Sequence, residues 1–183
     1  MRRSSVRVLV PLVTLLVALS ILAPPGGATR ATGKAKGTLD EPCTYVTTSK
    51  IAKVYGADVG EPVPSIPYLL CDFVVGDDPA APLGTLRVVQ LYPHFAQTTR
   101  NAKVAFQDQH AFDTVSEFEL ADVFNVGKQA YQNLDRASLV VQATKKFMFS
   151  VEWRATTPET PLPEPEQKKL KKLAKQIVKR APQ

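Results

Sequence analysis

The chain has 183 residues, which is enough for one ordinary domain and excludes a multidomain enzyme. A hydrophobic content of 44% and a charged content of 22% predict a buried core and exclude a disordered chain, a collagen-like rod and a coiled coil. Two cysteines and two histidines are too few for a zinc finger, an iron–sulfur cluster or a haem-attachment motif, so we expect no cofactor and no metal.

Residues 1–28 predict a signal peptide. Three arginines lie among the first seven residues, residues 8–23 are predominantly apolar, and small residues follow up to Ala28. Because export requires a basic segment, a short apolar segment and a small-x-small cleavage site, we expect cleavage near Ala28 and a secreted product. The alternative is an uncleaved membrane anchor, since an apolar run of 16 residues falls just short of the ~20 that span a bilayer.

Charge is distributed unevenly along the chain. Residues 29–165 carry 13 basic and 16 acidic residues, whereas residues 166–183 carry seven basic residues and one acidic residue. The positive charge of the exported product therefore belongs to its C-terminal end rather than to the whole protein.

Cys43 and Cys71 are the only cysteines, and two lone cysteines in an exported chain most simply form one disulfide. In the chain-entropy model, closing a loop of about 29 residues stabilises the fold by about 3 kcal/mol. The alternatives are two buried thiols or a redox pair, although a redox pair usually has the spacing C-x-x-C.

The region before the first strand is predicted to contain a tether and a short helix. Residues 29–41 are small and polar and predict a flexible tether, with a single domain over residues 42–181. Thr48 or Ser49 is suited to cap a helix of about two turns that ends at Gly56. A proline-containing connector follows at residues 60–67.

Two strands, residues 69–75 and 86–92, are predicted to form a hairpin through a broad turn. The loop at residues 77–84 begins with Asp77 and Asp78, which invite interpretation as a calcium site. Calcium needs six or more oxygen ligands at set positions, and no such register follows, so we interpret the loop as a solvated turn.

A long helix is predicted over residues 95–109, which contain neither glycine nor proline. His94 and His110 bracket this segment. Sixteen residues of helix would separate the two imidazoles by about 24 Å, too far to share a metal ion. We therefore interpret both as surface or capping histidines.

Three further strands are predicted at residues 129–134, 138–144 and 147–154. The last alternates Phe147, Phe149, Val151 and Trp153 with Met148, Ser150, Glu152 and Arg154. This alternation predicts a hairpin with one buried and one solvated face. We interpret Trp153 as a core residue rather than a ligand-stacking one, because aromatic residues in a strand stripe usually pack inside.

The last predicted helix, residues 166–179, has an apolar stripe and an otherwise basic surface. The stripe comprises Leu170, Leu173, Ile177 and Val178. Its lysines are either a solvated face or a surface for anionic wall or membrane components. Nucleic-acid binding is not expected, because the helix has no aromatic residues for stacking. The candidate contact residues are Lys168, Lys169, Lys171, Lys172 and Lys175.

The sequence contains no G-x-S-x-G elbow, no Walker loop, no G-x-G-x-x-G and no H-E-x-x-H motif, so no catalytic residue is assigned. Four features together resemble small secreted and lipoprotein domains of unknown function from actinobacteria: the helix between Cys43 and Gly56, the strand of Cys71, the segment at residues 126–131 (VGKQAY) before a strand hairpin, and the final helix. This resemblance implies an α+β sandwich similar to the PsbP-like fold, in which helices pack on an antiparallel sheet, and a location in the cell envelope. The chain lacks the lipobox cysteine of the lipoproteins.

We therefore expect a secreted α+β protein with one disulfide and two to three helices, acting as a non-enzymatic binding or accessory module in the envelope or medium. The alternatives are an extracellular enzyme or enzyme inhibitor whose site the sequence does not place, and a membrane-tethered sensory or accessory domain. Its protein partner, ligand and oligomeric state do not follow from the sequence.

Overall fold

The computed structural model describes residues 41–65, 69–78, 80–93, 101–157 and 159–181. The chain divides into two compact units, residues 1–32 and 33–183, and all of these residues belong to the second. The predicted signal peptide and residues 29–40 of the predicted tether lie outside the described residues.

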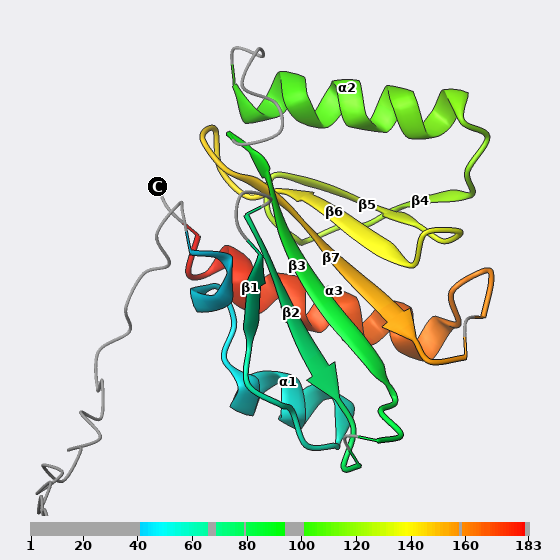
Figure 1. Cartoon of the computed structure of the whole chain (residues 1–183). Helices are drawn as coiled ribbons and strands as arrows, with labels where there is room; N and C mark the ends of the chain where they lie inside the picture. The colour runs from blue at the N-terminus through cyan, green and yellow to red at the C-terminus, as the bar shows by residue number, and fades with distance from the viewer. Residues whose placement is uncertain (1–40, 66–68, 79, 94–100, 158, 182–183) are drawn as a thin grey trace, which may run out of the picture. The chain divides into compact units, whose positions relative to one another are not determined.

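Three α-helices, a short 3-10 helix and seven strands make up the described part of this unit (Figure 1). In chain order they are η1 (Pro42–Thr44), α1 (Thr48–Tyr55), β1 (Val63–Ser65), β2 (Leu70–Val75), β3 (Gly84–Tyr92), α2 (Ala102–Val115), β4 (Leu120–Asp122), β5 (Gln129–Asn133), β6 (Ser138–Gln142), β7 (Met148–Ala155) and α3 (Glu164–Val178). The expected α+β class is thus confirmed at the level of an antiparallel sheet with three helices.

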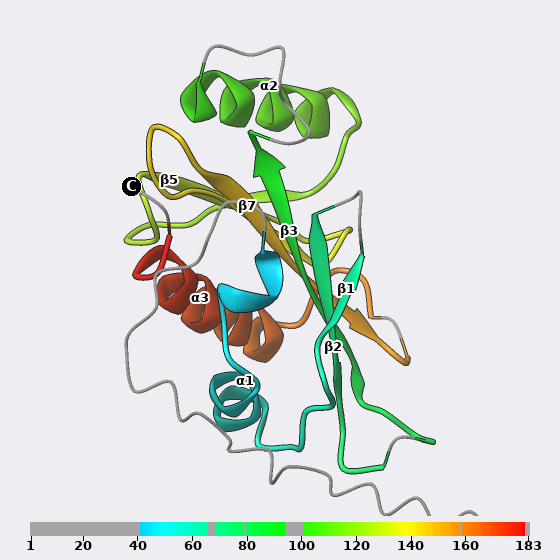
Figure 2. The same ribbon diagram turned by 60° about the vertical axis from the view of Figure 1, so that its left-hand side comes forward.

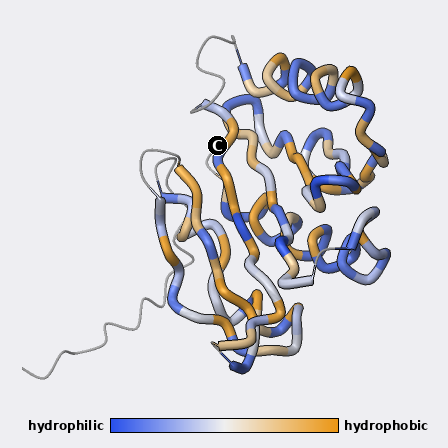
Figure 3. Tube along the Cα trace, turned by 45° about the vertical axis from the view of Figure 1, so that its right-hand side comes forward, coloured by the Kyte–Doolittle hydropathy of each residue, from blue (hydrophilic) through white to orange (hydrophobic). Residues whose placement is uncertain are grey.

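The strands form one antiparallel sheet in the order β1-β2-β3-β7-β6-β5-β4. The last strand, β7, lies between β3 and β6; it pairs along its length with β3 and over residues 148–152 with β6. It therefore joins the N-terminal strands to the C-terminal ones, and its hydrophobic residues lie at the centre of the sheet (Figure 3).

The helices cover opposite faces of this sheet (Figures 1 and 2). One face, packed under α1 and α3, holds the larger cluster of buried residues, including Phe73, Phe149 and Val151. The other face holds a smaller cluster, in which Phe106 of α2 packs with Val140 and Met148. Because β6 contributes residues to both clusters in alternation, all five of its residues are buried.

Coverage on both faces corrects the prediction that β7 has one solvated face. Met148 is 1% exposed and Ser150 is 3% exposed, and both lie on the face that was expected to meet water. The alternation predicted correctly which residues share a face, but α2 covers part of the second one. Glu152 and Arg154, farther along the strand, keep 24% and 54% of their side-chain surface exposed.

The position of α2 also differs from the prediction. The helix begins at Ala102, because the side chain of Asn101 accepts hydrogen bonds from the backbone N–H groups of Lys103 and Val104 at 3.0 and 3.1 Å, and it continues to Val115. His110 therefore lies inside the helix rather than beyond its end, and His94 is outside the described residues. Asparagine is a preferred N-cap, the residue that directly precedes a helix.

Two edge strands, β1 and β4, were not predicted. β1 lies within the proline-containing connector, and each edge strand has only three residues. Strands this short show too little alternation to be recognised, and pairing with β2 and β5 is what defines them.

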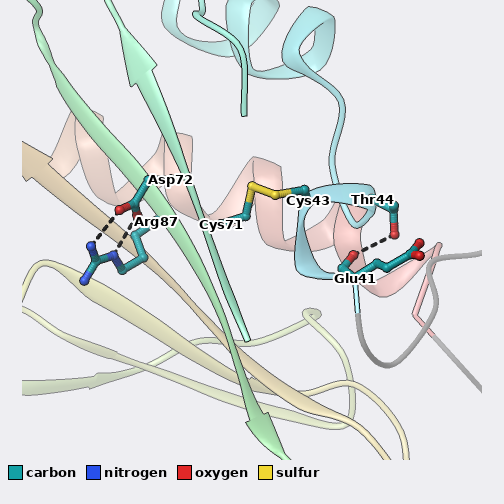
Figure 4. The surroundings of a disulfide bond; sticks show 6 residues. All are labelled: Glu41, Cys43, Thr44, Cys71, Asp72 and Arg87. Atoms are coloured by element: carbon teal, nitrogen blue, oxygen red, sulfur yellow. Dashed lines mark hydrogen bonds and ion pairs between the residues drawn. A yellow bond between two sulfur atoms is a disulfide. The ribbon is translucent and has the colours of Figure 1, made fainter. Parts of the chain in front are cut away.

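The predicted disulfide is confirmed. Cys43 in η1 and Cys71 in β2 are bonded, with their Cα atoms 5.1 Å apart (Figure 4). Next to it in the chain, Tyr45 is fully buried and packs edge-to-face on Phe147, with ring centroids 5.1 Å apart. The bond therefore links η1, near the start of the described residues, to the sheet.

Candidate functional site

The helix α3 is strongly amphipathic. Leu170, Leu173, Ala174 and Ile177 are fully buried against the sheet, and the predicted Val178 packs at their edge. Repeats of three and four residues place these side chains on one side of the helix, so that other residues at the same spacing lie on the opposite side.

Five lysines recur with this spacing on the side away from the sheet. We call them the lysine stripe: Lys168, Lys171, Lys172, Lys175 and Lys179. All are exposed except Lys171, which is half-buried. At a rise of 1.5 Å per residue, the stripe extends about 16 Å along the helix. Four of the five predicted contact residues belong to it.

Only one lysine of the stripe has an acidic partner in the described part of the chain. Lys168 Nζ lies 2.7 Å from Glu164 Oε1, and this ammonium lowers the pKa of the Glu164 carboxyl. No ion pair is formed by Lys171, Lys172, Lys175 or Lys179 with another described residue. Like charges three or four residues apart repel by about 0.2–0.5 kcal/mol per pair, so the stripe opposes helix stability.

Lys169, the fifth predicted contact residue, does not belong to the stripe. Its ammonium lies 2.7 Å from Glu166 Oε1 and 4.9 Å from the centroid of the Tyr55 ring. Tyr55 stacks in turn on Trp153, with centroids 4.5 Å apart. The stack of Lys169, Tyr55 and Trp153 joins α3, α1 and β7, and Trp153 is a core residue as predicted.

The backbone of β3 also lies close to Trp153. A Cβ added at Gly84 would lie 2.8 Å from Trp153 Cζ2, so only glycine leaves room for the indole. Trp153 therefore packs against both the Tyr55 ring and β3, and it is 7% exposed.

A cavity of about 540 Å³ adjoins this stack at the N-terminal end of α3. We call it the α3 pocket. Its walls come from α1, the loop before β3, the turn between β5 and β6, β7 and the segment that leads into α3. The lining combines apolar groups with charged ones, including Leu83, Trp153, Leu162, Arg136, Glu166 and Lys169.

Two residues that line the α3 pocket each have a side-chain oxygen with no hydrogen-bond partner in the described part of the chain. These oxygens are the hydroxyl of Tyr55 and Oε2 of Glu166, and both are shielded from solvent. Burial, together with the charge of Glu166, raises the pKa of Tyr55, so its hydroxyl keeps its proton. An unpaired buried polar group costs about 1–3 kcal/mol, so these atoms favour a bound polar group.

The segment at residues 126–131 builds a different cavity, about 470 Å³ in volume, between α2 and the loop that joins β4 to β5. Gly127 has φ +62°, and a Cβ there would lie 2.6 Å from the carbonyl oxygen of Gln142. Ala130 is buried in the larger core cluster, and the Tyr131 hydroxyl donates to Asp113 Oδ2 at 2.9 Å. The residues of this segment thus hold the loop, the core and α2 in place.

The two aspartates of the loop at 77–84 accept backbone hydrogen bonds, one from another segment and one within the turn. Asp77 Oδ1 accepts from the N–H of Asp58 at 2.9 Å, and Asp78 Oδ1 accepts from the N–H of Ala80 at 2.8 Å. Leu83, at the end of this loop, reaches the α3 pocket. Among the residues placed by the structure, no three His, Cys, Asp or Glu side chains are grouped so as to hold a metal ion.

His110, the histidine within the described residues, packs against aromatic rings. Its ring lies edge-to-face with Tyr131 at 4.8 Å and stacks loosely on Phe106 at 6.5 Å.

No helix in the described ranges is long and apolar enough to cross a membrane.

The lysine stripe follows from the sequence by its spacing, but the α3 pocket does not. Its walls come from five separate segments, and no local sequence pattern predicts that these segments meet. The one signal was Trp153, the only tryptophan of the chain. No family model, no curated protein and no solved structure matches the chain.

Proposed function

We propose that this protein is a secreted or envelope-associated binding module that holds an anionic wall polymer or membrane surface through the lysine stripe, without covalent chemistry. We also propose that the chain is related to the secreted domains of actinobacteria that it resembles, and that its helices and sheet are arranged as in the PsbP-like fold. A disulfide is compatible with an extracellular location, because such bonds persist in oxidising compartments.

The observation that carries the proposal is the one-sided charge of α3. Four of the five lysines of the stripe have no ion pair with a described residue, and they lie opposite the buried face, away from the sheet. Repulsion within the stripe is relieved when a polyanion lies along it. Such binding depends on salt, since exposed charges are screened over about 10 Å at 0.1 M ionic strength.

A charge-removal variant tests this assignment. Lys168, Lys171, Lys172 and Lys175 are replaced by glutamine, and a matched control replaces four exposed lysines elsewhere, Lys103, Lys128, Lys145 and Lys146. Both variants lose four positive charges. Cosedimentation is measured with phosphate-polymer-bearing cell walls and, separately, with vesicles of phosphatidylglycerol and phosphatidylcholine, from low to high salt.

We expect the stripe variant to bind at least tenfold more weakly than the native protein at low salt, and the control variant to stay within threefold. The two preparations distinguish a wall phosphate from a lipid phosphate as the preferred source. The melting temperature of the stripe variant should not fall, because like-charge pairs are removed. Equal losses in both variants would show that only net charge matters, and no loss in either would also contradict the proposal.

A further inference from the structure

The α3 pocket begins where the lysine stripe ends. Lys169 lines the pocket, and Lys168, the preceding residue of the helix, belongs to the stripe. A volume of about 540 Å³ lies within the range of about 300–1,000 Å³ that is usual for small-molecule sites. One polymer that follows the stripe can therefore place a terminal or side unit in the pocket.

The two unpaired oxygens define which group that unit carries. The Tyr55 hydroxyl can donate and accept, whereas Glu166 Oε2, as a carboxylate oxygen, can only accept. A phosphate or carboxylate placed there would be repelled by Glu166. An alcohol hydroxyl accepts from Tyr55 and donates to Glu166, so it satisfies both atoms at once.

The side chain of Lys169 occupies the place where a ring would enter. It lies over the face of Tyr55 that Trp153 leaves free, binds Glu166 Oε1, and keeps 31% of its surface exposed. When this long side chain swings outward, the Tyr55 ring becomes available to the C–H groups of a sugar. The ammonium then lies near the ligand, where it can pair with an acidic group.

We propose that the α3 pocket binds a sugar residue of an acidic polysaccharide, whose anionic groups continue along the lysine stripe. This inference rests on the proposed function and names the chemistry of its ligand. The pocket binds the hydroxyl groups of the sugar, and the stripe binds the negative charges of the polymer. Lys169 exchanges its contact with Tyr55 for one with the ligand.

Trp153 provides a direct measurement, because it is the only tryptophan and lies in the pocket wall. The full chain is titrated with oligogalacturonate, which carries hydroxyls and carboxylates, and with inorganic polyphosphate of matched charge, which carries no sugar hydroxyl. Binding is followed by calorimetry and by Trp153 fluorescence. The test variant is Tyr55→Phe, which keeps the ring, and the control is Tyr92→Phe on the opposite face of the sheet.

We expect both probes to bind with salt dependence, but only oligogalacturonate to change the Trp153 emission. Tyr55→Phe should weaken oligogalacturonate about tenfold and leave polyphosphate within twofold, while Tyr92→Phe changes neither. The inference is overturned if oligogalacturonate leaves the emission unchanged or if Tyr55→Phe binds it as the native chain does. If polyphosphate binds but oligogalacturonate leaves the Trp153 emission unchanged, the pocket inference is wrong and the stripe proposal stands; if neither probe binds, both are wrong.

Discussion

Asp113 connects α2 to the sheet, and its replacement by alanine should strongly destabilise the fold. The carboxylate is 2% exposed on the inner side of the helix. Its Oδ2 accepts from the Tyr131 hydroxyl at 2.9 Å and from Asn133 Nδ2 at 3.2 Å, and its Oδ1 accepts from Gln109 Nε2 at 3.1 Å. Arg136 Nη1 approaches within 4.0 Å.

The expected loss follows from the donors that remain. Asp113→Ala leaves the Tyr131 hydroxyl and Asn133 Nδ2 without this acceptor, and both residues are fully buried. At about 1–3 kcal/mol for each unsatisfied buried group, the loss is about 2–6 kcal/mol. Gln109 is half-buried and can turn to water, so it adds little. Asp113→Asn retains one acceptor oxygen and should lose about half as much.

Urea unfolding measured by circular dichroism gives these free energies. Asp108→Ala is the matched control, because Asp108 is exposed on the same helix, and its effect should stay within about 0.5 kcal/mol. A loss below about 1 kcal/mol for Asp113→Ala would refute the reasoning, since the buried donors would then have found other partners. An equal loss in Asp108→Ala would show that removing any carboxylate from α2, and not the loss of these hydrogen bonds, is responsible.

Three further predictions concern stability. Replacing Cys43 and Cys71 with serine should lower the free energy of unfolding by about 3 kcal/mol, measured by urea titration; an unchanged midpoint would contradict the chain-entropy argument. Gly127→Ala should cost at least about 2 kcal/mol in the same assay, because φ is +62° and the new Cβ meets backbone, and a neutral effect would mean that the loop shifts freely. Burial is the main cause that raises the pKa of both Tyr55 and Tyr131. Because these tyrosines ionise near pH 10 in the unfolded chain, the stability that they contribute is present below pH 10 and is lost as the pH rises above it, by up to about 1.4 kcal/mol per pH unit for each. The free energy of unfolding of Tyr55→Phe and of Tyr131→Phe should fall less steeply above pH 10 than that of the native chain. A native chain whose free energy of unfolding is constant from pH 9 to 11 would contradict this prediction.

Local signals were sufficient for several parts of this protein. Gly56 ends α1 with φ +70°, as a glycine after an apolar stripe predicts. The spacing of Leu170, Leu173 and Ile177 predicted the buried face of α3, and with it the position of the lysine stripe. The pairing of Cys43 with Cys71 followed because the chain has no other cysteine.

Other features depend on contacts between segments that lie far apart in the sequence. The alternation in β7 showed which residues share a face, but only the docking of α2 places Met148 of the second face in a buried cluster. In the sequence, Lys169 is one of several closely spaced lysines. The structure separates it from the stripe, because its ammonium lies over the ring of Tyr55 in another helix. By itself, the sequence determined periodicities, turns and one covalent bond, because these depend on neighbouring residues. The tertiary structure alone decided which strand lies at the centre and where the α3 pocket forms, because both depend on packing between distant segments.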